Sequence, residues 1–288
     1  MTAVISDAPS ASSYLLAESP KCLLAQADAV PGRFQEDGWG VGFFNARGVP
    51  AVVKSAGPAR LEKKAFAKAA AAAVSRVSVA HLRDASNPGK INKELLIGRA
   101  NTQPFSGGEL LFAHNGTLFI KEEIKSLLGK YAAGVKGLND SEVLFWQVVK
   151  MLDVYGSPVK ALEMALDEIR TVWISCKDRY PGLEAPCRGL NIFLASKNSL
   201  TVLCHYSGAW SSSVKKTGVP GGKTALLTPG WGFGSIAWRR DGGRAVFSSE
   251  PADARPGWKK MNDLQIAHAE LKGGRLGLKF SDIKGAAL

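Results

Sequence analysis

The sequence predicts an α+β fold in which helices cover antiparallel sheets. Apolar and β-branched runs typical of strands occur within the first 115 residues and again after residue 190. Between these two groups, residues 140–151 and 159–173 carry apolar side chains at helical spacing. No linker long enough to separate two units interrupts this order, so we expect one domain spanning residues 1–288.

Local patterns place the individual elements. Short apolar runs bounded by turn residues predict strands at residues 2–6, 41–45, 49–54, 77–82, 110–114, 190–195, 200–206, 245–249 and 264–269, which complete the predicted strand set. Helical spacing of apolar residues further predicts helices at residues 14–27, 60–74 and 122–128. The Asp-Gly-Trp-Gly segment at 37–40 predicts a tight turn, and residues 211–223 predict a polar surface loop.

Charge and composition narrow the class of protein. Apolar residues make up 45% of the chain, which is ordinary for a globular domain, and the formal net charge is +12. The lysines and arginines are dispersed, and no nucleic-acid-binding motif appears. This favours a solubilising surface that attracts anionic substrates, so a basic nucleic-acid-binding module is kept only as an alternative. Neither a signal peptide nor an apolar run of about 18 residues occurs, so we expect a cytoplasmic protein without a membrane partner.

The cysteines and histidines do not predict a metal site. The chain has four of each, and neither set shows a C-x-x-C pair or the spacing of metal ligands. Reduced cysteines and singly placed histidines with structural roles are the simplest interpretation. We therefore expect no metal and no cofactor.

Three short segments carry residues suited to the hydrolysis of a carboxamide. That reaction needs a nucleophile, a base and donors for the oxyanion. Asn115-Gly116 can supply two such donors, a side-chain amide and a backbone N–H, although Asn-Gly is also a common two-residue hairpin turn. Arg83, at the end of an apolar strand, can grip a carboxylate with two N–H groups. Asp140 can accept from an ammonium group, and it also has the position of a helix N-cap.

The order of these segments resembles a known family. The strings DGWGVGFF (37–44), AHLRDAS (80–86), NTQPF (101–105), LFAHNGTL (111–118), NDSEVLFW (139–146) and FSSEPADARPGW (247–258) follow one another in this order. Together they resemble the class II glutamine amidotransferases of the N-terminal-nucleophile hydrolase fold. The resemblance extends from about residue 2 to residue 269, and it is greatest to the branch of stand-alone γ-glutamyl amide hydrolases.

The resemblance implies a fold, a reaction and a set of roles. The fold would be a four-layer αββα sandwich with two mainly antiparallel sheets. Arg83 would bind the substrate carboxylate, Asn115 and Gly116 would form the oxyanion hole, and Asp140 would hold the substrate ammonium group. The reaction would cleave a glutamine or γ-glutamyl amide through a cysteine thioester, without a cofactor. Gln103 stands where the family often has histidine, and we expect this departure to have a modest effect.

The resemblance also implies partners. The small-molecule partner would be glutamine or a γ-glutamyl amide. No synthetase segment follows the amidotransferase-like motifs in this sequence. Transfer of ammonia would therefore require a separate amine-acceptor or synthetase subunit, and stand-alone hydrolysis is an equally good expectation.

The nucleophile presents a problem, because family members place cysteine directly after the initiator methionine. Here the second residue is Thr2. The favoured explanation is that the family opening Met-Cys-Arg lies just upstream, with Met1 in the position of the following leucine. A second explanation makes Thr2 an N-terminal nucleophile, although its register places it inside the first strand. A third is that the protein is catalytically inactive and keeps only a glutamine-binding or regulatory role.

Cys22 is a weak alternative nucleophile. The sequence KCLLA around it superficially resembles the family opening. The 15 residues from Cys22 to Asp37 (37 − 22 = 15) are too few for the strand and helix that should precede the DGWG segment. We therefore expect Cys22 to be a buried helical cysteine.

Overall fold

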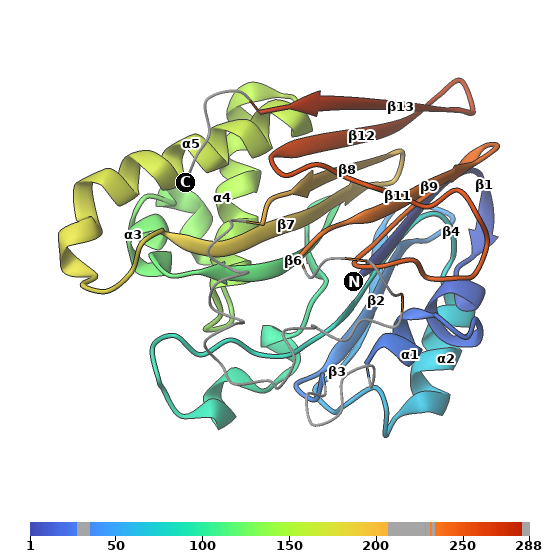
Figure 1. The fold of residues 1–288 in the computed structure, drawn as a ribbon, viewed down its shortest axis with the longest axis horizontal. Helices are drawn as coiled ribbons and strands as arrows, with labels where there is room; N and C mark the ends of the chain where they lie inside the picture. Colours follow the sequence, from blue (N-terminus) through green and yellow to red (C-terminus); the bar gives the residue numbers. More distant parts are fainter. Residues whose placement is uncertain (28–34, 207–227, 229–230, 232–233, 284–288) are drawn as a thin grey trace.

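The computed structural model describes residues 1–27, 35–206, 228, 231 and 234–283. Two antiparallel sheets face each other, and helices cover their outer surfaces (Figure 1). This confirms the predicted α+β fold with four layers in the order αββα. The surface loop predicted at residues 211–223 lies outside the described residues.

The first sheet has seven strands in the order β11-β9-β10-β1-β4-β2-β3. Their bounds are β1 Thr2–Ala11, β2 Trp39–Phe44, β3 Pro50–Ser55, β4 Val74–Leu82, β9 Ala237–Asp241, β10 Arg244–Ser248 and β11 Lys259–Lys260. Strand β1 lies between β10 and β4, where Thr2 pairs with Ser248 on one side and Ala80 on the other. The first residues of the chain are therefore central in this sheet.

The second sheet has six strands in the order β13-β12-β8-β7-β6-β5. Their bounds are β5 Phe105–Gly107, β6 Leu110–Leu118, β7 Cys187–Ser196, β8 Ser199–Cys204, β12 Gln265–Lys272 and β13 Arg275–Asp282. All neighbouring strands are antiparallel.

Helices cover the outer face of each sheet. The π-helical turn Tyr14–Glu18, α1 (Leu23–Gln26) and α2 (Lys63–Ala72) pack on the first sheet. Helices α3 (Lys121–Ser126), α4 (Asp140–Tyr155) and α5 (Pro158–Cys176) pack on the second. Short 3₁₀ segments occupy Lys93–Leu96, Arg99–Asn101, Gly129–Gly134 and Lys177–Arg179. Within the described ranges, none of the helices combines the length and apolarity needed to cross a bilayer.

The period-2 alternation of strand side chains decides which residues face the space between the sheets. In β1, Met1, Ala3 and Ile5 belong to the apolar cluster that fills this space. Val77 and Val79 of β4 belong to the same cluster, as do Leu111 and Ala113 of β6. Residues of the same parity further along these strands, such as His81 and Asn115, therefore point toward the same space.

Two predicted turns are wrong, and glycine explains both. Strand β6 continues through Asn115-Gly116 instead of turning there, and it pairs with β7 as far as Leu118. A Cβ atom on Gly116 would stand 1.9 Å from the carbonyl oxygen of Gly189, so glycine here permits close approach of two strands. Likewise, β2 begins at Trp39, where a turn was predicted, and a Cβ on Gly40 would stand 2.2 Å from the oxygen of Gln103.

The predicted strand set was incomplete. Strands β5, β9, β11 and β13 are additional, and β13 follows β12 after a short turn. The predicted helices are found with shifted ends. One predicted helix cap is wrong: the N-cap of α4 is Asn139 and not Asp140, because the side-chain oxygen of Asn139 accepts from the N–H of Glu142 at 2.9 Å. Strands β9, β11 and β13 lie together at one edge of the two sheets, whereas β5 lies at the other edge of the second sheet.

Candidate active site

The candidate site lies where the ends of β1, β4 and β6 approach the N-terminus of α4. Arg83 follows β4 directly, and its backbone N–H donates to the carbonyl of Gly38 at 2.8 Å, so the extended ladder continues through it. Asn115 projects from β6 and Asp140 from the first turn of α4. The opposite charges of Arg83 and Asp140 lie close enough that Asp140 counteracts the fall in the pKa of Arg83. The structure thus brings the predicted residues into one region.

Arg83 is buried, and part of its guanidinium is held by the backbone. Its Nη1 donates to the carbonyl oxygens of Leu96 at 2.7 Å and Asp37 at 3.2 Å. Burial lowers the pKa of Arg83 below its ordinary value, and the carboxylates of Asp37, Asp140 and Asp84 oppose that shift. Within the described residues, Nε and Nη2 have no protein acceptor, so the other edge of the guanidinium is free to bind an anion.

The loop that precedes β2 supports Arg83. The buried carboxylate of Asp37 accepts from the N–H of Ala85 at 2.8 Å and pairs with Lys93 at 3.0 Å. The same residue donates its backbone N–H to the carbonyl of Arg83. This network fixes the segment that carries the guanidinium, which is the preorganisation a binding group needs.

Asn115 is half-buried, and its side-chain amide has no hydrogen-bond partner within the part of the chain that the structure describes. Its strand neighbour Gly116 cannot accept a side chain, because the backbone of Gly189 and the ring of His114 occupy that volume. The unpaired amide N–H of Asn115 is the kind of donor that an oxyanion requires.

Gln103 fixes the position of β6 immediately before Asn115. Its Oε1 accepts from the backbone N–H of His114 at 2.6 Å, and its Nε2 donates to the carbonyl of the same residue at 3.0 Å. The Nε2 group also reaches Ser141 Oγ at 3.3 Å. The side chain therefore pairs with both backbone groups of His114, as a neighbouring strand would. This is a positioning role for the residue that departs from the family pattern.

Asp140 is buried at the first helical position of α4. Its Oδ2 accepts from the backbone N–H of Leu118 at 2.6 Å, which ties the helix to the end of β6. No described group donates to Oδ1, so one carboxylate oxygen can still accept from a ligand ammonium group.

The N-terminal end of β1 completes the region. The Met1 ammonium group donates to Ser249 Oγ at 3.0 Å, and the N–H of Ser249 donates to the Met1 carbonyl at 3.0 Å. Burial lowers the pKa of this amine from 8.0 to about 5, although the charge of Glu250 opposes the shift. An amine held here is therefore neutral at pH 7 and able to accept a proton.

Two buried histidines lie beside these groups. The pKa of His81 is lowered well below 6.5, first by burial and then by the positive charges of the N-terminus and Arg83. The pKa of His114 is lowered by burial and raised in part by Asp140. His114 Nδ1 bonds Ser141 Oγ at 2.9 Å, whereas its Nε2 and the Nδ1 of His81 have no described partner. Both imidazoles are neutral above pH 6.5.

The two weak nucleophile candidates lie elsewhere. Thr2 has the opposite parity to Met1 and Ala3, so its side chain points away from the inter-sheet space and shares a hydrogen bond with Ser248 Oγ at 2.8 Å. Cys22 is the N-cap of α1 in the outer helical layer, where its Sγ accepts from the N–H of Ala25 at 3.4 Å. Burial raises the pKa of the Cys22 thiol from 9.0.

Sequence reasoning missed His81, Ser249 and Glu250 as members of this region. All three stand inside the recognised motifs, His81 two residues before Arg83 and the other two within FSSEP. His81 could have been predicted, because residues two apart in a strand point to the same face, and His81 lies two residues before Arg83. The contact of Ser249 with Met1 could not, because it depends on pairing across 248 residues of sequence.

Comparison with known proteins places the chain in a class. The family described as class II glutamine amidotransferases matches residues 24–175, just over half of the chain. The protein belongs to this family. Its matched part contains Arg83, Asn115, Gly116 and Asp140. No curated protein sequence matches the chain.

Solved structures show the same fold at low sequence identity. A glutamine aminotransferase class-II domain protein from Silicibacter pomeroyi is 16% identical with a TM-score of 0.58, covering 96% of this chain and 97% of that one. Glutamine phosphoribosylpyrophosphate amidotransferase from B. subtilis, complexed with ADP and GMP, is 13% identical with a TM-score of 0.58. That match covers 96% of this chain and 48% of the other.

Proposed function

We propose that this protein binds glutamine or a γ-glutamyl amide and hydrolyses the amide through a cysteine thioester. One observation supports the proposal most directly. Arg83, Asn115 and Asp140 converge from three elements, and each keeps polar atoms without a partner in the described chain. Unsatisfied polar groups that are buried and held in fixed positions are costly unless a ligand pairs with them.

The chemistry of these groups suits the two ends of a glutamine. The free edge of Arg83 fits the α-carboxylate, and the free oxygen of Asp140 fits the α-ammonium group. The Asn115 amide and the Gly116 backbone would then meet the side-chain carbonyl, where negative charge develops during attack. Hydrogen bonds to charged groups contribute about 1.5–3 kcal/mol each, so loss of either charged partner should greatly weaken binding.

Strand register supports a cysteine located just upstream of Met1. Thr2 pairs with Ala80 in the antiparallel β1–β4 ladder, so Met1 falls opposite His81. The residue before Met1 would then fall opposite Leu82, and the one before that opposite Arg83. In the family opening Met-Cys-Arg, this second position is the cysteine. It has the parity of Met1 and Ala3, so its thiol would face the inter-sheet space as Asn115 does.

The proposed reaction follows from that placement. The free α-amine of the cysteine accepts the thiol proton, and the thiolate attacks the amide carbonyl. The tetrahedral oxyanion is held by Asn115 and Gly116, and it collapses to a thioester while the amine proton passes to the departing amine or ammonia. Water then hydrolyses the thioester and releases glutamate.

The test has a genetic part and an enzymatic part. The codons immediately upstream of Met1 should read in frame as Met-Cys-Arg, and protein carrying them should release glutamate from L-glutamine or a γ-glutamyl amide. Asp140→Asn should abolish that release, whereas Asp167→Asn on the exposed face of α5 should not. Unrelated upstream codons together with glutamine binding would leave a glutamine-binding or regulatory protein. Glutamate release that is unchanged in Asp140→Asn would reject the proposed site.

The identity of the leaving amine sets the partner. If ammonia from glutamine is passed on, a separate amine-acceptor or synthetase subunit would stimulate glutamate release when added. If a γ-glutamyl amide is the substrate, release would proceed at full rate with the protein alone. Measuring both rates with the same preparation separates the two forms of the proposal.

A further inference from the structure

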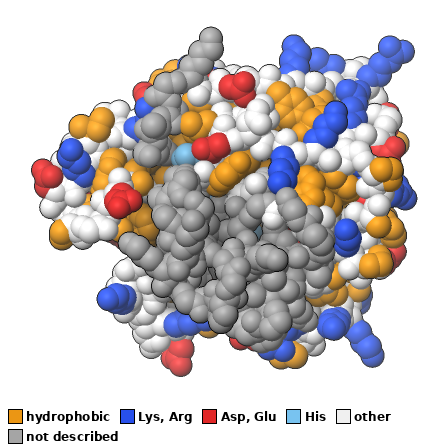
Figure 2. Space-filling model, viewed as in Figure 1, with side chains coloured by type: hydrophobic (Ala, Val, Ile, Leu, Met, Phe, Trp, Pro, Cys, Tyr) orange, Lys and Arg blue, Asp and Glu red, His pale blue; other side chains and the backbone are white. Residues whose placement is uncertain are grey.

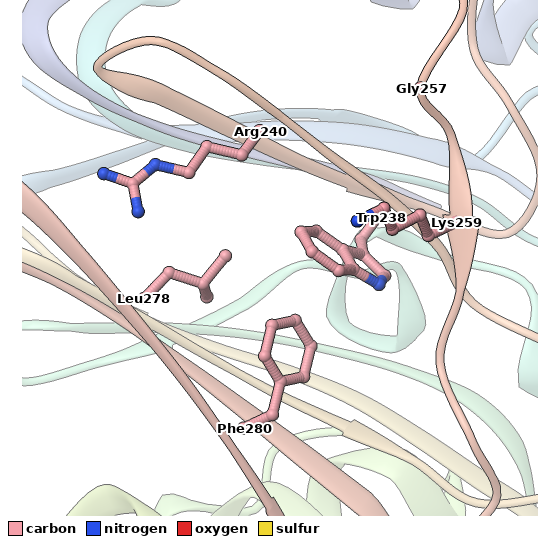
Figure 3. A pocket seen from close by; sticks show the side chains of 6 residues that line it. All are labelled: Trp238, Arg240, Gly257, Lys259, Leu278 and Phe280. Atoms are coloured by element: carbon pink, nitrogen blue, oxygen red, sulfur yellow. The ribbon is translucent and has the colours of Figure 1, made fainter.

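A cavity opens at one edge of the sandwich. It has a volume of about 310 Å³ and is lined by Trp238, Arg240, Gly257, Lys259, Leu278 and Phe280 (Figure 3). Sites for small molecules occupy about 300–1,000 Å³, so this cavity is at the small end of that range. We call it the aromatic pocket.

The aromatic pocket is built by the edge strands β11 and β13 and by β9, the second strand of the first sheet. Trp238 and Arg240 alternate with Arg239 on β9, and Arg239 points the other way to pair with the buried Asp253 at 2.6 Å. Leu278 and Phe280 project from β13 toward β9. The rings of Trp238 and Phe280 lie 4.7 Å apart between centroids with an interplanar angle of 46°. The two sheets therefore leave an apolar, aromatic wall accessible at their open edge.

Two cations stand at the pocket and have no carboxylate partner. Arg240 donates from Nη2 to the carbonyl of Leu276 at 2.9 Å and from Nε to Gly242 at 3.3 Å, which holds its guanidinium in place. The adjacent carboxylate of Asp241 is directed to Arg255 at 3.5 Å. Lys259 Nζ lies 5.4 Å from the centroid of the Trp238 ring. In the described chain, no carboxylate oxygen comes within 4.0 Å of either cation.

We propose that the aromatic pocket binds a small anion carrying an aromatic ring, such as an aryl carboxylate or a nucleoside phosphate. The ring would pack against Trp238 and Phe280, where offset or edge contacts are favourable. The anionic group would take the free N–H donors of Arg240 and the Lys259 ammonium group, since Arg240 has five N–H donors and uses two. Figure 2 shows apolar and basic side chains side by side over this part of the surface.

The aromatic pocket is separate from the candidate active site formed by Arg83, Asn115, Gly116 and Asp140, which we call the amide site. In the first sheet, β10 lies between β9 and β1, and in the second, β12, β8 and β7 lie between β13 and β6. At about 4.8 Å per strand, β9 is roughly 10 Å from β1, and β13 is roughly 19 Å from β6, across the sheets. None of the residues that line the pocket belongs to the amide site, and this inference does not depend on the proposed hydrolysis.

The test uses 8-anilinonaphthalene-1-sulfonate, an aromatic anion that fluoresces in apolar surroundings. We expect one saturable site per chain. The double variant Arg240→Gln/Lys259→Gln should weaken binding at least tenfold, and Phe280→Ala about fivefold. The matched control is Arg275→Gln/Lys279→Gln, which removes two exposed charges of the same sign from β13 positions of opposite parity. This control should bind within twofold of the wild type.

Competition identifies the source of the anion. Displacement by AMP but not by neutral adenosine indicates a nucleoside phosphate, and displacement by salicylate indicates an aryl carboxylate. The proposal is overturned if the wild type shows no saturable site, if neither anion competes, or if the pocket variant binds within twofold of the wild type. An equal loss in the control variant would also overturn it, because binding would then follow net charge. Asp140→Asn should leave probe binding unchanged.

Discussion

The amide site lies at the ends of the interior strands β1, β4 and β6, the aromatic pocket lies at one edge of the same two sheets, and the two regions hold their polar groups differently. In the amide site, Arg83, Gln103 and Asp140 are buried, and each is tied to backbone groups of another element. In the aromatic pocket, Arg240 and Lys259 are exposed, on the second strand and the edge strand of the first sheet. Buried groups need such partners, since a polar atom without one costs about 1–3 kcal/mol. Recognition and folding are therefore coupled in the first region and nearly independent in the second.

The largest loss of stability and of glutamine binding should come from Gly116→Ala, which tests whether folding and recognition are coupled in the amide site. A Cβ atom would stand 1.9 Å from the oxygen of Gly189, so β6 and β7 must separate locally. We expect a loss of about 3 kcal/mol or more in the free energy of unfolding and no glutamine binding. The control is Gly89→Ala, where the nearest atom is 3.8 Å away and unfolding should change by less than about 0.5 kcal/mol. Urea denaturation measures both, and similar stability of the two variants would contradict the close-approach account.

Gln103→Leu should have the next largest effect. It removes a side chain that pairs with the N–H and C=O of His114, leaving two buried backbone groups without partners. We expect a loss of about 1–3 kcal/mol in unfolding free energy. We also expect a weaker affinity for glutamine, because Asn115 directly follows His114, whose backbone Gln103 holds in place. The matched control is Gln265→Leu, which removes two exposed hydrogen bonds, one to Asp282 and one from the N–H of Asn262. Equal stability of the two variants would show that Gln103 does not position β6.

Acidification should destabilise the amide site through His81. Its folded pKa lies well below 6.5, so the native state stays neutral while the unfolded state binds a proton as pH falls below 6.5. Stability is therefore unaffected by this group above pH 6.5 and decreases below it, by at most about 1.4 kcal/mol per pH unit. In His81→Gln, the difference in unfolding free energy between pH 7.5 and pH 5.5 should be about 1 kcal/mol smaller than in the wild type. An unchanged difference would mean that His81 is not buried as a neutral group.

The smallest change in stability should come from a substitution in the aromatic pocket. Lys259→Gln should change the free energy of unfolding by less than about 0.5 kcal/mol, because this exposed lysine has no carboxylate partner in the described chain. The affinity of the Lys259→Gln variant for glutamine should equal that of the wild type. Urea denaturation and glutamine titration check the two statements, and a large change in either would show that the two regions are coupled.

The positions of Arg83 and Asp140 in the fold were largely predictable, because both residues stand at the ends of locally recognisable elements. Arg83 follows an apolar strand, and Asp140 opens a patterned helix. The interior position of Asn115-Gly116 was not predictable, because it depends on Gly189, which meets Gly116 only through the pairing of β6 with β7. Local sequence cannot distinguish an Asn-Gly turn from a strand that needs glycine for a distant neighbour.

The aromatic pocket was missed because its strands were missed. The alternation of Leu276, Leu278 and Phe280 with polar residues was visible, and a period-2 reading predicts β13 from it. Trp238 and Arg240 follow a segment without regular patterning, and their strand has five residues. The cavity itself arises only when β9 and β13, from two different sheets, meet at an open edge. No local sequence pattern predicts the contact between these two strands.

Calorimetric titration of L-glutamine into the wild type, Arg83→Lys and Asp140→Asn tests the central claim most directly. We expect one site per chain in the wild type, with affinity at least tenfold weaker in each variant, because each substitution removes one charged partner or its paired geometry. Butyramide, which has the amide but neither charged group, should bind weakly and equally to all three proteins. L-glutamine that binds all three proteins with the same affinity would contradict the assignment of Arg83 and Asp140 to substrate recognition.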